Sequence, residues 1–130
     1  MKKKIILIGT GTNTNQIIDE IEKYNDLKIE GIVFFEKKFK KKFKNYKILG
    51  ELKILKQSKY KNCEILITLG DTKLRKKVAK SIFRKDIKNK FFTLISKNSI
   101  VSKKSEIDEG SIVMTGCVIN SNSEIGKHSL

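Results

Sequence analysis

A glycine-rich segment near the amino terminus has the residue types that cradle a phosphate group. The segment Gly9–Thr14 (GTGTNT) approaches the G-x-G-x-x-G pattern, with Thr14 in the third glycine position. Gly9 would permit a tight turn after a strand, and Gly11 would let backbone amides approach an anion at a helix N-terminus. We expect ligand contacts from Gly9, Gly11, Thr12 and Asn13, and we expect Thr14 to crowd the contact between helix and strand. A glycine-rich turn that binds nothing is the alternative.

Three further groups could reach a ligand bound at that turn. Glu36, which directly follows Phe35, is placed to bind a ribose hydroxyl at the end of a second strand. A surface ion pair is the simpler interpretation of Glu36. Asp71 follows Gly70 at the end of another apolar run, where it could cap a helix or accept a ligand hydrogen bond. Arg75, one helical turn later, could pair with Asp71 or with an anionic ligand, although a solvated position is the default.

The elements that must position these residues follow from the apolar patterning. Strands are predicted at Lys3–Ile8, Leu27–Phe35, Cys63–Leu69 and Phe91–Ile95, with a short extended piece at Tyr46–Leu49; helices are predicted at Gln16–Tyr24, Glu51–Gln57 and Thr72–Phe83. This alternation predicts an α/β fold, a Rossmann-like open parallel sheet that binds ligands at the carboxyl ends of its strands. We expect this domain to span residues 1–97.

A period of six positions marks the last third of the chain. Branched aliphatic residues follow small residues at a fixed offset: Val101, Ile107, Val113, Ile119 and Ile125 come two positions after Ser99, Ser105, Ser111, Cys117 and Ser123. A β-helix built from hexapeptides has this period, with each hexapeptide forming one side of a triangular coil. We therefore expect residues 98–130 to start a parallel β-helix. Five hexads make fewer than two coils, so we expect a fragment, a truncated product or a piece completed by a partner.

The charge of the chain bears on its partners. The 130 residues carry a formal net charge of +15, from 29 Lys and Arg against 14 Asp and Glu. Only Arg75 and Arg84 are arginines, whereas sites that read a nucleic-acid sequence favour arginine. We therefore expect a solvated lysine-rich surface and no specific nucleic-acid partner. Electrostatic nucleic-acid binding through Lys37–Lys44, a predicted basic loop or frayed helix, is a minor alternative.

Few residues offer redox, metal or acid–base chemistry. Cys63 and Cys117 have no second Cys or His at metal-ligand spacing, so we expect buried free thiols and no metal site. His128 is the single histidine and has no partner nearby in the sequence, so we do not expect a catalytic base there. No apolar stretch has the roughly 20 residues that cross a bilayer, and we predict a cytoplasmic protein without a membrane span.

Three segments together resemble a known family. Ile8–Gly11, Ile67–Lys77 (ITLGDTKLRKK) and Ser105–Asn120 (SEIDEGSIVMTGCVIN) are similar, in this order, to sugar O-/N-acyltransferases of the sialic acid O-acetyltransferase type. That family includes the acetyltransferase that makes diacetylated bacillosamine. The resemblance implies a Rossmann-like domain that holds a nucleotide-sugar, followed by a left-handed β-helix. It also implies homotrimers that bind acetyl-CoA, as co-substrate, between neighbouring β-helices.

The resemblance also matches individual residues of this chain to positions in the family's site, and several residues differ from the family's usual ones. Gly9, Gly11, Gly70 and Asp71 match the nucleotide-sugar side of the family's site. Asn13 stands where the family usually has His, Thr12 and Thr14 replace glycines, and Phe34 and Phe35 stand where acidic residues contact the nucleotide. The family's catalytic His lies one coil further on, so His128 comes too early to match it, and we expect no catalytic residue within these 130 residues.

The resemblance implies an acetyltransferase that acts on a nucleotide-activated amino sugar or sialic acid, with this chain carrying the substrate-binding domain. The alternative is a non-catalytic module that binds NAD or another nucleotide and regulates a partner.

Overall fold

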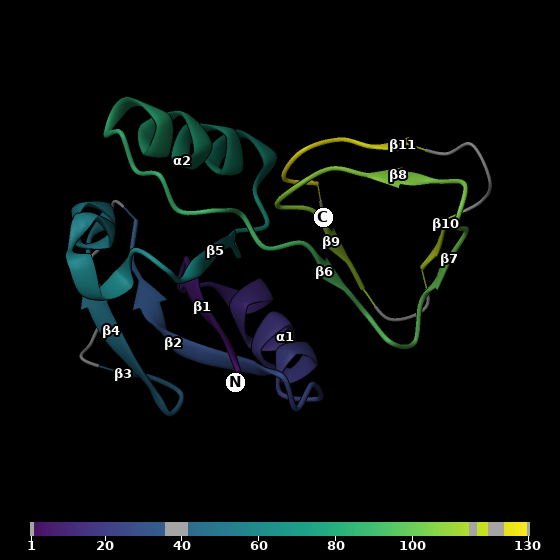
Figure 1. Ribbon diagram of the computed structural model, residues 1–130, viewed down its shortest axis with the longest axis horizontal. Coiled ribbons are helices and arrows are strands. Elements are labelled where there is room, and N and C mark those ends of the chain that lie inside the picture. Colours follow the sequence, from purple (N-terminus) through teal and green to yellow (C-terminus); the bar gives the residue numbers. More distant parts are fainter. Residues whose placement is uncertain (1, 36–41, 115–116, 120–123, 130) are drawn as a thin grey trace.

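The first part of the chain folds around a five-stranded sheet. The structure, a computed structural model, describes residues 2–35, 42–114, 117–119 and 124–129. The strand order is β3-β4-β2-β1-β5, and all neighbours are parallel except the edge pair β3 and β4 (Figure 1). The strands are β1 (Lys3–Ile8), β2 (Leu27–Val33), β3 (Lys42–Phe43), β4 (Tyr46–Gly50) and β5 (Glu64–Ile67). The predicted parallel sheet is therefore confirmed, with β1 at its predicted bounds.

Two helices cover opposite faces of this sheet. Side chains alternate between the faces along a strand, so Ile5 and Leu7 of β1 pack with α1 (Thr12–Ile21), whereas Ile6 and Ile8 pack with α2 (Thr72–Arg84). The 3-10 helices η1 (Leu52–Lys56) and η2 (Ser58–Tyr60) lie on the α2 side and add to the same core. Apolar residues at helical spacing, such as Val78 and Ile82 of α2, make each helix amphipathic and explain which side it buries.

Several predicted elements differ from the observed ones. The first helix begins at Thr12 rather than Gln16 and ends at Ile21 rather than Tyr24, because the glycine-rich turn itself caps the helix. The prediction that Phe91–Ile95 forms one strand of the sheet is wrong. Phe91 forms a single parallel bridge to Ile65 of β5, and β6 (Leu94–Ile95) pairs elsewhere. In the predicted basic loop Lys37–Lys44, Lys42–Phe43 form β3 and residues 37–41 lie outside the described part.

The hexad segment, residues 94–129, returns to the same side with every third strand. Its strands are β6, β7 (Ile100–Val101), β8 (Glu106–Ile107), β9 (Ile112–Val113), β10 (Val118–Ile119) and β11 (Glu124–Ile125). The pairs β6–β9, β7–β10 and β8–β11 are all parallel and join positions three hexads apart, as Leu94 joins Ile112. The three pairs outline a triangle (Figure 1). One hexad for each of three sides accounts for the spacing found in the sequence.

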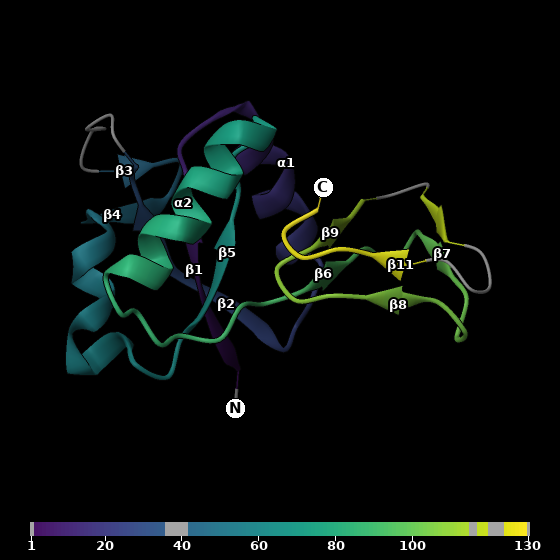
Figure 2. The same ribbon diagram turned by 90° about the horizontal axis from the view of Figure 1, so that it is seen from above.

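Burial in the hexad segment alternates only in part, because Ile112, one position before Val113, is buried as well. Val113 is buried, whereas Ile100, one position before an aliphatic of the series, is 67% exposed. Ile95 lies six positions before Val101 and so extends the series by one member that was not predicted; it is 40% exposed. Leu94 and Ile112 pack in the same core as α1, so the first side of the triangle lies against that helix (Figures 1 and 2). The hexad segment is thereby fixed to the sheet.

Candidate functional site

The glycine-rich turn between β1 and α1 is built around two residues. Gly9 has φ of +131°, and a Cβ there would lie 2.8 Å from Thr68 Oγ1, so no other residue fits. Thr14 is fully buried; its Oγ1 accepts the Gly11 N–H at 3.1 Å, donates to the Gly9 carbonyl at 3.1 Å and lies 2.8 Å from Thr68 Oγ1. The prediction that Thr14 crowds the helix–strand contact is therefore wrong, because its hydroxyl ties the turn together. A Cβ on Gly11 would meet nothing within 4 Å.

A second turn meets the first at the carboxyl ends of β1 and β5. A Cβ on Gly70 would lie 1.9 Å from Asn13 Nδ2, so the Asn13 side chain covers Gly70. Asp71 is exposed, and its Oδ1 accepts the Leu74 N–H at 3.0 Å, which makes it the N-cap of α2. The expectation that the two turns share one edge of the sheet is confirmed. The capping role of Asp71 is also confirmed.

Arg75 joins α2, β5 and the hexad segment. Its side chain is 4% exposed, so the predicted solvated position is wrong. Nε and Nη2 donate to the His128 carbonyl at 2.8 and 2.5 Å, and Nη1 donates to the carbonyls of Ile67 and Leu69 at 2.8 and 3.0 Å. Burial lowers the pKa of Arg75. Among the described residues no carboxylate forms an ion pair with this guanidinium, Asp71 included.

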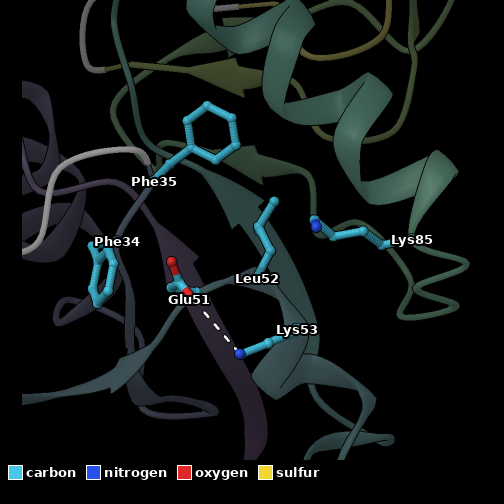
Figure 3. A pocket seen from close by; sticks show the side chains of 6 residues that line it. All are labelled: Phe34, Phe35, Glu51, Leu52, Lys53 and Lys85. Atoms are coloured by element: carbon cyan, nitrogen blue, oxygen red, sulfur yellow. Dashed lines mark ion pairs between the residues drawn. The ribbon is translucent and has the colours of Figure 1, made fainter.

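The end of β2 carries the aromatic pair singled out in the sequence. Phe34 and Phe35 point in different directions and line a cavity of about 130 Å³ (Figure 3). Glu51 and Lys53 lie across it and form an ion pair of 3.9 Å. Phe35 packs partly against the core on the α2 side. Glu36, the predicted ribose ligand, lies outside the described residues.

A larger cavity lies between α2 and the last residues of the hexad segment. Its volume is about 590 Å³, and it reaches the edge where the two turns meet because Gly70 is one of its lining residues. Its lining consists of Gly70, Thr72, Arg75, Lys76, Ala79, Lys80, Lys127, His128 and Ser129. Of this set, only Gly70 and Arg75 were predicted as site residues, because residues 127–129 are remote from α2 in the sequence.

His128 stacks within the hexad segment. It has φ of +56° at a corner, one full coil after Gly110, and a Cβ on Gly110 would lie 2.2 Å from His128 Nδ1. Its ring meets Phe91 edge to face at 4.4 Å between centroids. Nδ1 is buried, without a hydrogen-bond partner among the residues described. Burial and then the charge of Arg75 lower the pKa of His128.

The described part of the chain contains neither a cluster of metal-ligating side chains nor a helix that could span a membrane. No group of three or more His, Cys, Asp or Glu side chains there could hold a metal ion. None of its helices combines the length and apolar character that crossing a membrane requires. Both cysteines are free; Cys63 is buried, which raises the pKa of its thiol, whereas Cys117 is exposed, contrary to prediction.

A mainly parallel sheet with helices on both faces and a glycine-rich first turn defines an open α/β domain of the kind that binds ligands at its strand ends. Residues 4–82 match the PglD N-terminal domain family, and the chain belongs to that family. No curated protein matches the chain.

Solved structures share the fold over nearly the whole chain. Perosamine N-acetyltransferase from Caulobacter crescentus, solved as a mutant with CoA and GDP-perosamine, is 21% identical with a TM-score of 0.82; the match covers 96% of this chain and 58% of that one. The acetyltransferase domain of PglB from Neisseria gonorrhoeae, solved with acetyl coenzyme A, is 19% identical with a TM-score of 0.76, covering 98% and 60%. The chain thus spans about three fifths of these structures.

Proposed function

We propose that the chain is the nucleotide-sugar-binding part of an acetyl-CoA-dependent acetyltransferase acting on an amino sugar or sialic acid. The observation that carries the proposal is the meeting of the Gly9–Thr14 and Gly70–Asp71 turns at the carboxyl edge of the sheet. Membership of the PglD N-terminal domain family supports it. Two structures with the same fold are acetyltransferases solved with CoA and GDP-perosamine or with acetyl coenzyme A.

The proposed contacts follow from the placement of each residue. Gly11 is the N-cap of α1 and has open space where its side chain would be, so a phosphate could approach the helix N-terminus there. Thr12 begins that helix, and Asn13 and Asp71 supply polar groups on either side of Gly70. Gly9 serves by permitting the turn.

The nucleoside end of the ligand is proposed to lie near the end of β2. Phe35 is partly buried beside the 130 Å³ cavity, where its ring offers an apolar face to a base. Glu36 remains a candidate for the ribose. Arg75 is retained as a substrate-binding residue through its place in the larger cavity.

Residues 98–130 are proposed to be the start of a left-handed parallel β-helix, with the domain boundary between residues 97 and 98. β6 lies just before this boundary and pairs with β9 in the same coil. The parallel pairing at intervals of three hexads supports the β-helix. The proposal also includes a homotrimer and a cleft for acetyl-CoA between β-helices, which the family resemblance implies. It further includes a cytoplasmic location, which we predicted from the apolar pattern of the sequence. We assign no catalytic residue, and His128, packed against Gly110 and edge to face with Phe91, is not proposed as the base.

Thermal unfolding with a panel of ligands tests the proposal. UDP-sugars, CMP-sialic acid, NAD and acetyl-CoA would each be added to the full chain. A nucleotide-sugar present at 100 times its Kd should stabilise the fold by about 2.7 kcal/mol. The Gly11→Val variant should fold, because a Cβ at this extended position meets nothing, and should lose the stabilisation.

Two outcomes would contradict the proposal. Stabilisation by NAD alone would favour the regulatory nucleotide-binding module. Equal stabilisation of the wild type and Gly11→Val by nucleotide-sugars would remove the glycine-rich turn from the site.

A further inference from the structure

The 590 Å³ cavity between α2 and residues 127–129 concentrates positive charge. Lys76 and Lys80 stand one helical turn apart on α2, are exposed, and form no ion pair with any residue in the described ranges. Lys127 faces them from the hexad segment, and its Nζ lies 3.5 Å from Glu109 Oε1, the one carboxylate paired with the described lysines of the lining. Three ammonium groups therefore share a cavity whose lining contains no acidic residue among those described.

Arg75 adds an independent observation at the same cavity. It is only 4% exposed, yet its hydrogen bonds go only to the neutral carbonyls of Ile67, Leu69 and His128. Buried charges in proteins are usually paired with an opposite charge, because desolvation is costly. Here the carbonyl oxygens satisfy the donors but leave the positive charge without a counter-charge among the described residues. The cavity therefore offers an anion a buried cation together with three exposed ones.

We propose that this cavity binds phosphate oxygens, supplied by the diphosphate of the nucleotide-sugar. The proposal rests on the proposed function for the identity of the ligand, but not for the chemistry of the site. Gly70 contacts Asn13 and also lines the cavity, so the cavity opens directly at the edge where the two turns meet. A volume of about 590 Å³ lies in the range of roughly 300–1,000 Å³ typical of small-molecule sites.

The test uses matched pairs of charge-removing variants on one helix. Lys76→Gln/Lys80→Gln removes two charges from the cavity, and Lys73→Gln/Arg84→Gln removes two exposed charges of α2 that do not line it. The full chain, labelled with ¹⁵N, would be titrated with inorganic pyrophosphate, UDP, CoA and uridine at a fixed salt concentration. Backbone amide shifts report both the place of binding and the Kd.

Pyrophosphate and UDP should shift amides of residues 70–80 and 127–129, whereas uridine, which has no phosphate, should not. Their Kd values should rise about three- to tenfold in Lys76→Gln/Lys80→Gln, from the loss of two exposed charge-assisted contacts, and less than about twofold in the control. Equal weakening in both variants would overturn the proposal, because the effect would then follow net charge alone. Shifts that are absent from these residues, or spread over lysines elsewhere, would overturn it as well.

The results for the different ligands and variants distinguish this proposal from the proposed function. Pyrophosphate binding in the cavity without any nucleotide-sugar binding would uphold the anion site and contradict the proposed function. UDP binding that is lost in Gly11→Val but unchanged in Lys76→Gln/Lys80→Gln would do the reverse. CoA binding tighter than UDP at the same amides would contradict the nucleotide-sugar as the source of the phosphate.

Discussion

Replacing Arg75 with methionine should detach the end of the hexad segment from the sheet. Methionine has a similar length, favours helices and keeps the apolar part of the side chain, but it has no donor. The variant therefore removes the hydrogen bonds to the carbonyls of His128, Ile67 and Leu69 while α2 stays intact.

The expected loss follows from two opposing terms. A hydrogen bond from a charged donor contributes about 1.5–3 kcal/mol, and Arg75 serves three carbonyls, which would suggest a loss well above that of a single bond. Burial of a guanidinium without a counter-charge costs several kcal/mol, which methionine avoids. Because the cavity beside Arg75 can also admit water to the freed carbonyls, we expect a net loss of about 2–3 kcal/mol.

Urea unfolding and amide hydrogen exchange measure this loss at two scales. The free energy of unfolding should fall in Arg75→Met, and amides of residues 124–129 should exchange faster while those of β1 keep most of their protection. Arg75→Lys should lose about 1 kcal/mol or more, because a point charge cannot reproduce the planar fork. Arg84, exposed on the same helix, provides the control: Arg84→Met should stay within about 0.5 kcal/mol of the wild type.

Equal stability of Arg75→Met and Arg84→Met, together with unchanged exchange at residues 124–129, would contradict the expected role of Arg75. Such a result would mean that the carbonyl contacts of Arg75 only balance the cost of burying its charge. Faster exchange throughout β1 as well would mean that Arg75 supports the whole sheet rather than the contact with the hexad segment.

Two further predictions concern His128. Gly110→Ala should destabilise the chain by about 2–4 kcal/mol, since a left-handed φ costs about 1–2 kcal/mol and the new Cβ overlaps the His128 ring. Adding His128→Ala should restore only the part of the stability that the overlap removes. Full recovery of the free energy of unfolding, measured with urea, would contradict the contribution of φ. Burial and the neighbouring charge of Arg75 lower the pKa of His128, with Lys127 adding to and Glu109 opposing the shift. The folded chain then binds fewer protons than the unfolded one, so the stability tied to neutral His128 is full above about pH 6.5 and declines as pH falls through the folded-state pKa. Relative to His128→Gln, the wild type should lose stability as the pH falls from about 7 to about 5; a constant difference would refute the shift.

Local patterning predicted most of the sheet but misjudged contacts between distant residues. The apolar run Lys3–Ile8 specified β1 because a short continuous apolar run ending in glycine fits a strand buried on both faces. Thr14 looked too large for its position because its hydrogen bonds include one with Thr68, which is remote in the sequence. Phe91–Ile95 read as one strand because nothing local reveals that β6 pairs with β9 instead.

The amino-acid sequence alone determined the order of most strands and helices along the chain and the shared edge of the two glycine turns. It also determined the return of the chain after every three hexads. Each of these features follows from the spacing of apolar residues and glycines. The spacing of apolar residues and the backbone conformations open to glycine act between residues that are close in the sequence, so both can be recognised without the structure. Only the tertiary structure decided that Arg75 is buried beneath His128 and that lysines of α2 face Lys127 across a cavity. Those contacts depend on how α2 packs against the hexad segment, and the local sequence pattern carries no information about that packing.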